Sequence, residues 1–146
     1  MRARRHALSA MLICVAAVTA CATASELPTL EAATRRLDAD ADALIRASEL
    51  RLTSLRRADD DTCVPGQLRH FVQAESELAD AADGLLARLR TLGYDKVVDD
   101  LDLRDDEQGV AVLRHPTTRL EFELTVLSGE RAGVRVVGKT TCYAAG

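Results

Sequence analysis

The spacing of apolar residues changes near Tyr94, and this change divides the chain into two kinds of structure. From Thr29 to about Arg57, and again from 65 to 92, apolar side chains recur at helical intervals of three and four. After Tyr94 they alternate with polar side chains, most regularly from 119 to 126, which is typical of a strand with one buried face. The pattern predicts helices followed by strands.

The two helical segments are predicted to form an antiparallel hairpin, because the connection between them is short. Thr29 is a suitable N-cap for the first helix, and Gly93 is a suitable C-terminal stop for the second. Pro65 is acceptable at the first position of the second helix, while Gly84 is a candidate kink within it. This hairpin would occupy residues 29–93.

Four strands with short turns predict an antiparallel meander in residues 94–146. Glu121 and Glu123 are expected to face water. The inward face of the clearest strand is expected to carry Leu120, Phe122, Leu124 and Val126. The expected strands are 97–103, 109–113, 120–126 and 132–139. Since a sheet face of this kind must be covered, the sequence predicts an α+β fold. In it, an N-terminal helical hairpin packs on a C-terminal β-meander of three to four strands, within one domain over 29–146.

The first twenty residues have the composition of an export signal. Arg2, Arg4 and Arg5 precede an apolar run from 7 to 20. This run is shorter than the roughly 20 residues that a membrane-spanning helix needs, and it matches the roughly 7–15 residues of a secretory signal.

The tetrapeptide Val18-Thr19-Ala20-Cys21 follows this run. It resembles the lipobox of bacterial lipoproteins, in which a Leu or Val, a small residue and Ala or Gly precede the cysteine that receives lipid. The resemblance implies a signal peptide over 1–20, fatty acylation (palmitate) of Cys21 and a short tether over 21–28. A second cleavage site, after Ala24, would instead release a soluble exported protein, and the sequence leaves both open.

Cysteine usage agrees with export. Of the four cysteines, Cys14 lies in the signal and Cys21 would carry the lipid, which leaves Cys63 and Cys142. Two remaining thiols in an oxidising compartment predict a disulfide between them. A reactive thiol would need an activating neighbour, and neither cysteine lies in a C-x-x-C pair.

The exported part of the chain is acidic. The whole chain has 19 basic and 23 acidic residues. Removing the three arginines of the signal leaves 16 basic residues and a net charge of −7. Nucleic-acid binding is not expected, because affinity for phosphate backbones comes from clustered Lys and Arg. If charge selects a partner, a basic protein is expected.

No group of residues predicts catalysis, a metal ion or a cofactor. Asp38, Asp40, Asp42 and Glu49 have the spacing of an EF-hand loop, but Ala43 stands where its turn needs glycine. The acidic clusters 59–61 and 105–107 are expected to be solvated loops rather than cation sites. Outside the signal, the only histidines are His70 and His115, which are too few for a zinc site. Nucleophile-elbow and phosphate-loop motifs are absent.

The sequence therefore predicts a small bacterial lipoprotein with a non-enzymatic binding or accessory role in the cell envelope. It would be anchored through Cys21 and would face the periplasm or the cell exterior. No small-molecule ligand is identifiable from the sequence. A second hypothesis is an immunity protein or inhibitor that neutralises a toxin or a wall-degrading enzyme, for which an acidic, rigid, exported domain is suited.

Overall fold

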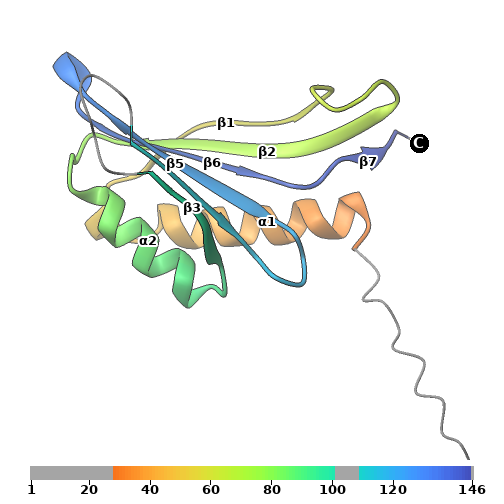
Figure 1. The fold of residues 1–146 in the computed structure, drawn as a ribbon, viewed down its shortest axis with the longest axis horizontal. Helices are drawn as coiled ribbons and strands as arrows, with labels where there is room; N and C mark the ends of the chain where they lie inside the picture. Colours follow the sequence, from red (N-terminus) through yellow and green to blue (C-terminus); the bar gives the residue numbers. More distant parts are fainter. Residues whose placement is uncertain (1–27, 101–108, 146) are drawn as a thin grey trace, which may run out of the picture.

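The structure is a computed structural model that describes residues 28–100 and 109–145. Within these residues, seven strands form one antiparallel sheet, and two α-helices lie against one of its faces (Figure 1). The elements follow the chain as α1 (Leu30–Ile45), the 3-10 helix η1 (Ser48–Leu50), β1 (Thr53–Asp60), β2 (Gln67–Ser76), α2 (Ala81–Thr91), β3 (Asp95–Asp100), β4 (Val110–Arg114), β5 (Glu121–Leu127), the 3-10 helix η2 (Gly129–Arg131), β6 (Gly133–Lys139) and β7 (Tyr143–Ala144).

The strand order across the sheet is β1-β2-β6-β5-β4-β3, with the short β7 paired to the start of β2. The last four long strands form a meander in chain order, and the hairpin of β1 and β2 is added beside β6. β2 and β6 therefore lie inside the sheet, while the charged strands β1 and β3 form its two edges. Charged edge strands discourage pairing with other chains.

The predicted fold, a helical hairpin on a meander of three to four strands, is wrong. Residues 29–57 contain α1 only as far as Ile45, followed by η1 and the start of β1. Residues 65–92 contain the ten-residue strand β2 before α2 begins. The two helices are separated along the chain by a β-hairpin, and each packs directly on the sheet (Figure 1).

The end of α1 carries no glycine or proline signal, which explains the first error. Helical geometry stops at Arg46, and Arg51 then adopts a left-handed conformation with φ of 47° before β1 begins. Leu52 is buried, although it lies beyond the helix. Leu52 continues the three- and four-residue spacing of the apolar residues in α1. The end of the helix is therefore not visible in that spacing.

The buried face of β2 contains small and polar residues, which explains the second error. His70, Val72, Ala74 and Ser76 are buried and alternate with half-buried side chains. Only two of these four are apolar, so the alternation has little contrast in hydropathy. Pairing with β1 on one side and β6 on the other makes this segment a strand.

Strands β3 to β6 overlap the four expected segments, of which residues 101–103 lie outside the described residues, and the short β7 was not predicted. The exposure of some side chains also differs from the prediction. Leu120, Phe122 and Leu124 are buried against the helices, and Val126 is half-buried. Glu121 and Glu123 lie on the opposite face, as the alternation requires. They are half-buried among neighbouring side chains instead of facing open water.

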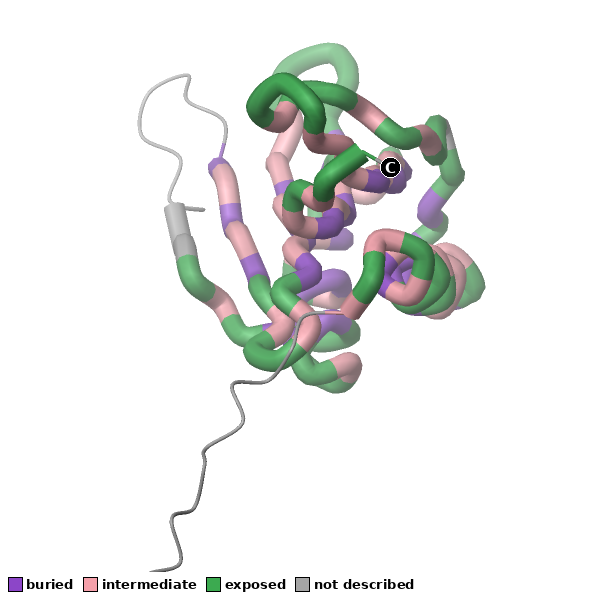
Figure 2. The backbone as a smooth tube through the Cα atoms, turned by 90° about the vertical axis from the view of Figure 1, so that its right-hand side faces the viewer, coloured by how far each residue is buried: buried purple, intermediate pink, exposed green. Residues whose placement is uncertain are grey.

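The core lies between the two helices and the inner face of the sheet. Figure 2 shows the buried segments gathered toward the helices, with exposed segments on the outside of the molecule. A Cβ on Gly138 would lie 2.6 Å from Phe122 Cε1 and 2.9 Å from Leu37 Cδ1. Glycine at this position therefore allows α1 to pack closely on β6 and β5. The largest fully buried side chains are Tyr94, Phe122, Leu37, Leu44, Leu50, Leu85, Leu89, Leu113, Leu120, Leu124 and Val134.

The outer face of the sheet is covered by no helix of the described part of the chain (Figure 1). We call it the open face. Its side chains come from the alternate positions of β1, β2, β6, β5 and β4, and those described are mostly half-buried by one another. No helix in the described residues is both long and apolar enough to cross a membrane.

Candidate functional site

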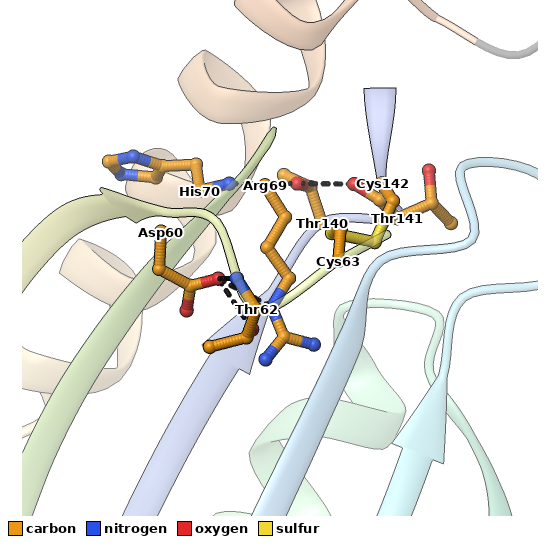
Figure 3. Close-up of a disulfide and its surroundings, with 8 residues drawn as sticks. All are labelled: Asp60, Thr62, Cys63, Arg69, His70, Thr140, Thr141 and Cys142. Carbon is orange, nitrogen blue, oxygen red and sulfur yellow. Dashed lines mark hydrogen bonds and ion pairs between the residues drawn. A yellow bond between two sulfur atoms is a disulfide. The ribbon is translucent and has the colours of Figure 1, made fainter. Parts of the chain in front are cut away.

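Cys63 and Cys142 are joined by a disulfide, with their Cα atoms 6.0 Å apart (Figure 3). Cys63 lies in the loop between β1 and β2, and Cys142 lies between β6 and β7. The bond therefore holds one end of the sheet together. Cys21 and the signal over 1–20 lie outside the described residues, so their predicted roles stay predictions.

His70 lies between two carboxylates on the helix side of β2. Its Nδ1 is 2.7 Å from Asp59 Oδ1, and its Nε2 is 3.3 Å from Asp38 Oδ1. The two contacts hold the ring between β1 and α1, with each ring nitrogen against a carboxylate.

The four acids with EF-hand spacing are held in separate contacts along α1 and η1 and do not gather around one point. Asp38 and Asp42 both pair with Arg57 of β1. Glu49 pairs with Arg88 of α2. In the described part of the chain, no three His, Cys, Asp or Glu side chains are grouped as a metal site. Residues 105–107 lie outside that part.

Asp40, the remaining member of this set, is buried. Tyr94 donates its hydroxyl to Asp40 Oδ2 at 2.8 Å, and Arg36 Nε donates to the same oxygen at 3.1 Å. Burial of Tyr94, together with the charge of Asp40, raises the pKa of the phenol far above its usual range. The contact fixes α1 to the chain that follows α2, which is a structural role.

His115 shapes the turn between β4 and β5. Its Nδ1 accepts hydrogen bonds from the amides of Thr117 and Thr118 at 3.4 and 3.3 Å. Its ring packs edge-on against Tyr94, with centroids 5.3 Å apart. This histidine therefore also has a structural role.

Four cationic side chains surround an open basin at one end of the open face, beside the disulfide. Its volume is about 430 Å³. The basin is lined by Arg69, Arg114, Arg119, Lys139, Glu121, Thr140, Thr141 and Cys142. No other hollow described on this molecule gathers as many basic side chains.

Glu121 is the one acid among the residues that line the basin. Its Oε2 accepts a hydrogen bond from Arg114 Nη2 at 2.7 Å, and its Oε1 lies 3.0 Å from Lys139 Nζ. Burial raises the pKa of Glu121, but hydrogen bonds from Arg114 and Lys139 outweigh this and hold it below its usual value of 4.5. The carboxylate is therefore charged at neutral pH and positions both cations.

Arg69 enters the basin from β2, on the side opposite His70 (Figure 3). Its Nε donates to Asp60 Oδ1 at 3.1 Å, and Thr62 donates to the same oxygen from its hydroxyl at 2.7 Å. Arg119 enters from the turn after β4 and has a left-handed backbone, with φ of 59°. No carboxylate in the described residues pairs with Arg119.

The basin is not recognisable in the sequence, because its four cations are spread from residue 69 to residue 139. The register of the strands, however, could have revealed part of the basin. Glu121 pairs across the sheet with Arg114 on one side and with Lys139 on the other. Charge complementarity between facing positions could have grouped these three residues once the strands were aligned.

Neither a protein-family model, nor a curated protein, nor a solved structure matches this chain. Functional proposals for the chain therefore rest on its sequence and its geometry.

Proposed function

We propose that this chain is an exported bacterial lipoprotein with a non-enzymatic binding role, anchored through Cys21, that uses the open face of its sheet. The lipobox resemblance of Val18-Thr19-Ala20-Cys21 supports the anchor. The engagement of both His70 and His115 in fixed hydrogen bonds supports a role without catalysis. The observation that carries the proposal is that, among residues 28–100 and 109–145, the helices cover only one face of the sheet.

The side chains of the open face are held in place by contacts within the face. Arg135 Nε donates to Glu75 Oε1 at 2.6 Å, across β6 and β2. The guanidinium of Arg56 lies 5.0 Å from the centre of the Phe71 ring. A surface ordered in advance loses less conformational entropy when a partner binds. The face is therefore suited to binding a structured protein.

At long range, a basic protein is the partner that the overall charge favours; on the open face itself the acids are paired with cations, as in Glu75 with Arg135 and Glu121 with Arg114. The net charge of −7 on the exported residues attracts a cationic partner at long range and speeds its encounter. Val137 lies at the centre of the open face, between Gln73 of β2 and Glu123 of β5. A bound partner would cover this position first.

Photo-crosslinking in intact cells tests the proposal. A photoreactive residue at Val137 is expected to give one discrete adduct, which Arg135→Glu should abolish by breaking the order of the face. The matched control is Ala87, which is exposed on α2 on the opposite side of the sheet. Identical adducts from both positions, or none from Val137, would contradict the proposal. An adduct with a toxin or a wall-degrading enzyme would assign the inhibitory role.

A further inference from the structure

We propose that the basin beside the disulfide binds a phosphate group, presented by a lipid headgroup or by a small soluble phosphate. This site lies at one end of the open face, and it goes beyond the protein-binding role proposed above. Its lining combines Arg69, Arg114, Arg119 and Lys139 with Thr140 and Thr141, of which Thr140 already uses its hydroxyl on His70 N and on the Thr141 carbonyl. Guanidinium groups bind phosphate oxygens through paired, charge-assisted hydrogen bonds.

The contacts of the arginines with carboxylates leave donors for a ligand. Arg69 uses only its Nε on Asp60, and Figure 3 shows no bond from its two Nη atoms. Arg114 uses Nε and Nη2 on Glu121, which leaves Nη1. A guanidinium carries five N–H donors, so one carboxylate contact does not exhaust it. The basin therefore presents several preset donors.

Arg119 is the cation most available to an anion. Its left-handed φ of 59° is energetically costly for a residue other than glycine. The turn holds this conformation through the amide of Arg119, which donates to the carbonyl of His115 at 3.0 Å. The strain places a cation at the rim of the basin without a carboxylate partner among the described residues. A phosphate would be that partner.

Thr141 adds a polar group that is unsatisfied. Its Oγ1 is buried and has no hydrogen-bond partner, although the residue lines the basin. A buried hydroxyl without a hydrogen-bond partner destabilises the folded protein. A tetrahedral oxyanion bound by the arginines would remove this destabilisation once the Thr141 side chain turns its hydroxyl toward the basin.

The charge of the basin remains positive after its neighbours are counted. Four cations line it, against Glu121 in the lining and Asp60 and Glu123 as outer partners of Arg69 and Lys139. The excess positive charge is local, since the exported chain as a whole is acidic. The volume of the basin, about 430 Å³, lies within the roughly 300–1,000 Å³ that small-ligand sites occupy.

The position of the basin bears on the source of the phosphate. The basin lies at the same end of the molecule as the start of α1 and strand β7 (Figure 1). The chain from Cys21 to Pro28 can span at most roughly 25 Å. An anchor at Cys21 would therefore hold this end near the membrane surface. The headgroup source rests on that proposed anchor, whereas the phosphate site itself does not.

Titration of the full chain in non-ionic detergent with inorganic phosphate tests the site. The expected result is saturable binding with a change in the amide resonance of Thr141. Arg119→Gln should weaken the affinity at least tenfold, and Arg119→Lys should restore part of it. The matched control, Arg90→Gln, removes an exposed arginine of α2 outside the basin and should leave the affinity unchanged. No saturable binding, or an equal loss in Arg90→Gln, would overturn the proposal.

A second titration distinguishes the two sources. The same detergent micelles are doped with phosphatidylglycerol or with phosphatidylcholine, and the Thr141 resonance is followed again. If phosphatidylglycerol moves it at lower concentration than inorganic phosphate, and Arg119→Gln abolishes the effect, the site takes a lipid headgroup. If inorganic phosphate alone moves it, the site takes a soluble phosphate. A lipid effect that survives in Arg119→Gln would place lipid binding elsewhere and overturn the headgroup source.

Discussion

The buried carboxylate of Asp40 depends on two donors, Tyr94 and Arg36. Asp40 is 4% exposed, so its charge must be stabilised by these hydrogen bonds instead of by water. The other tyrosine, Tyr143, has a buried hydroxyl without a hydrogen-bond partner. The hydroxyl of Tyr94 is therefore expected to stabilise the folded protein, whereas that of Tyr143 is not.

Tyr94→Phe should lower the free energy of unfolding by about 1–3 kcal/mol, because it leaves a buried carboxylate short of one donor. Tyr143→Phe should be neutral or slightly stabilising, because the lost hydroxyl makes no hydrogen bond. Urea denaturation of both variants measures the difference. Equal losses would mean that the Asp40 contact contributes nothing.

Glu121 links stability to pH. Its pKa in the folded protein lies below 4.5, the value for a free side chain. The ionised form is therefore favoured by folding, and its stabilising contribution is complete above pH 4.5 and is lost as pH falls through the folded pKa. Glu121→Gln should be less stable than the parent at neutral pH, and the two should converge in acid. A stability difference that does not change between pH 7 and pH 3 would contradict this.

Among the helices and strands, the sequence predicts a strand well when its two faces differ strongly in hydropathy. β5 places Phe122 and Leu124 inside and glutamates outside, so its alternation identified a strand. β2 buries His70 and Ser76 with its apolar residues, so its alternation was concealed. The end of α1 was missed because the helix stops at Arg46 and the chain turns again at Arg51, in both places without glycine or proline. In both failures, pairing within the sheet overrides the local pattern.

Phe122 and Gly138 test how α1 packs on the sheet. Phe122→Ala should cost about 3–5 kcal/mol, since the ring is fully buried. Gly138→Ala should cost about 1–3 kcal/mol, because its Cβ would overlap Phe122 and Leu37. Glu123→Ala, on the open face, should cost at most about 1 kcal/mol, the upper range for one exposed ion pair. Chemical denaturation of the three variants gives the ranking. A Glu123→Ala loss equal to that of Phe122→Ala would mean that the wrong face is buried.

At the scale of the whole molecule, the disulfide joins chain segments that the sheet already brings together. It closes a sequence separation of 79 residues between the β1–β2 loop and the segment before β7. The chain-entropy account assigns about 4–5 kcal/mol to a closed loop of this length. The same bond borders the basin, so its loss would also loosen Thr140 and Thr141.

Replacing both Cys63 and Cys142 with serine should therefore lower stability by up to about 4–5 kcal/mol. Reduction of the parent by a dithiol should lower its melting temperature in parallel, while the double variant should not respond to reductant. Differential scanning calorimetry with and without reductant checks both effects. An unchanged melting temperature for the reduced parent would contradict the expected contribution of the bond.

The functional surface was less predictable than the strands, for a physical reason. Arg69, Arg114 and Lys139 approach one another only through the register of β2, β6, β5 and β4. Their spacing along the chain therefore does not indicate that they share a site. A lipid anchor, by contrast, is specified by a contiguous segment, so its position at Cys21 can be predicted from the sequence alone.

The intact mass of the protein extracted from cell membranes tests the central claim most directly. We expect a mature chain that begins at Cys21 and carries a diacylglyceryl group, with two or more acyl chains in total. In Cys21→Ser we expect the mass of the unprocessed precursor instead. A mature chain that begins at unmodified Ser25, recovered from the soluble fraction, would contradict membrane anchoring.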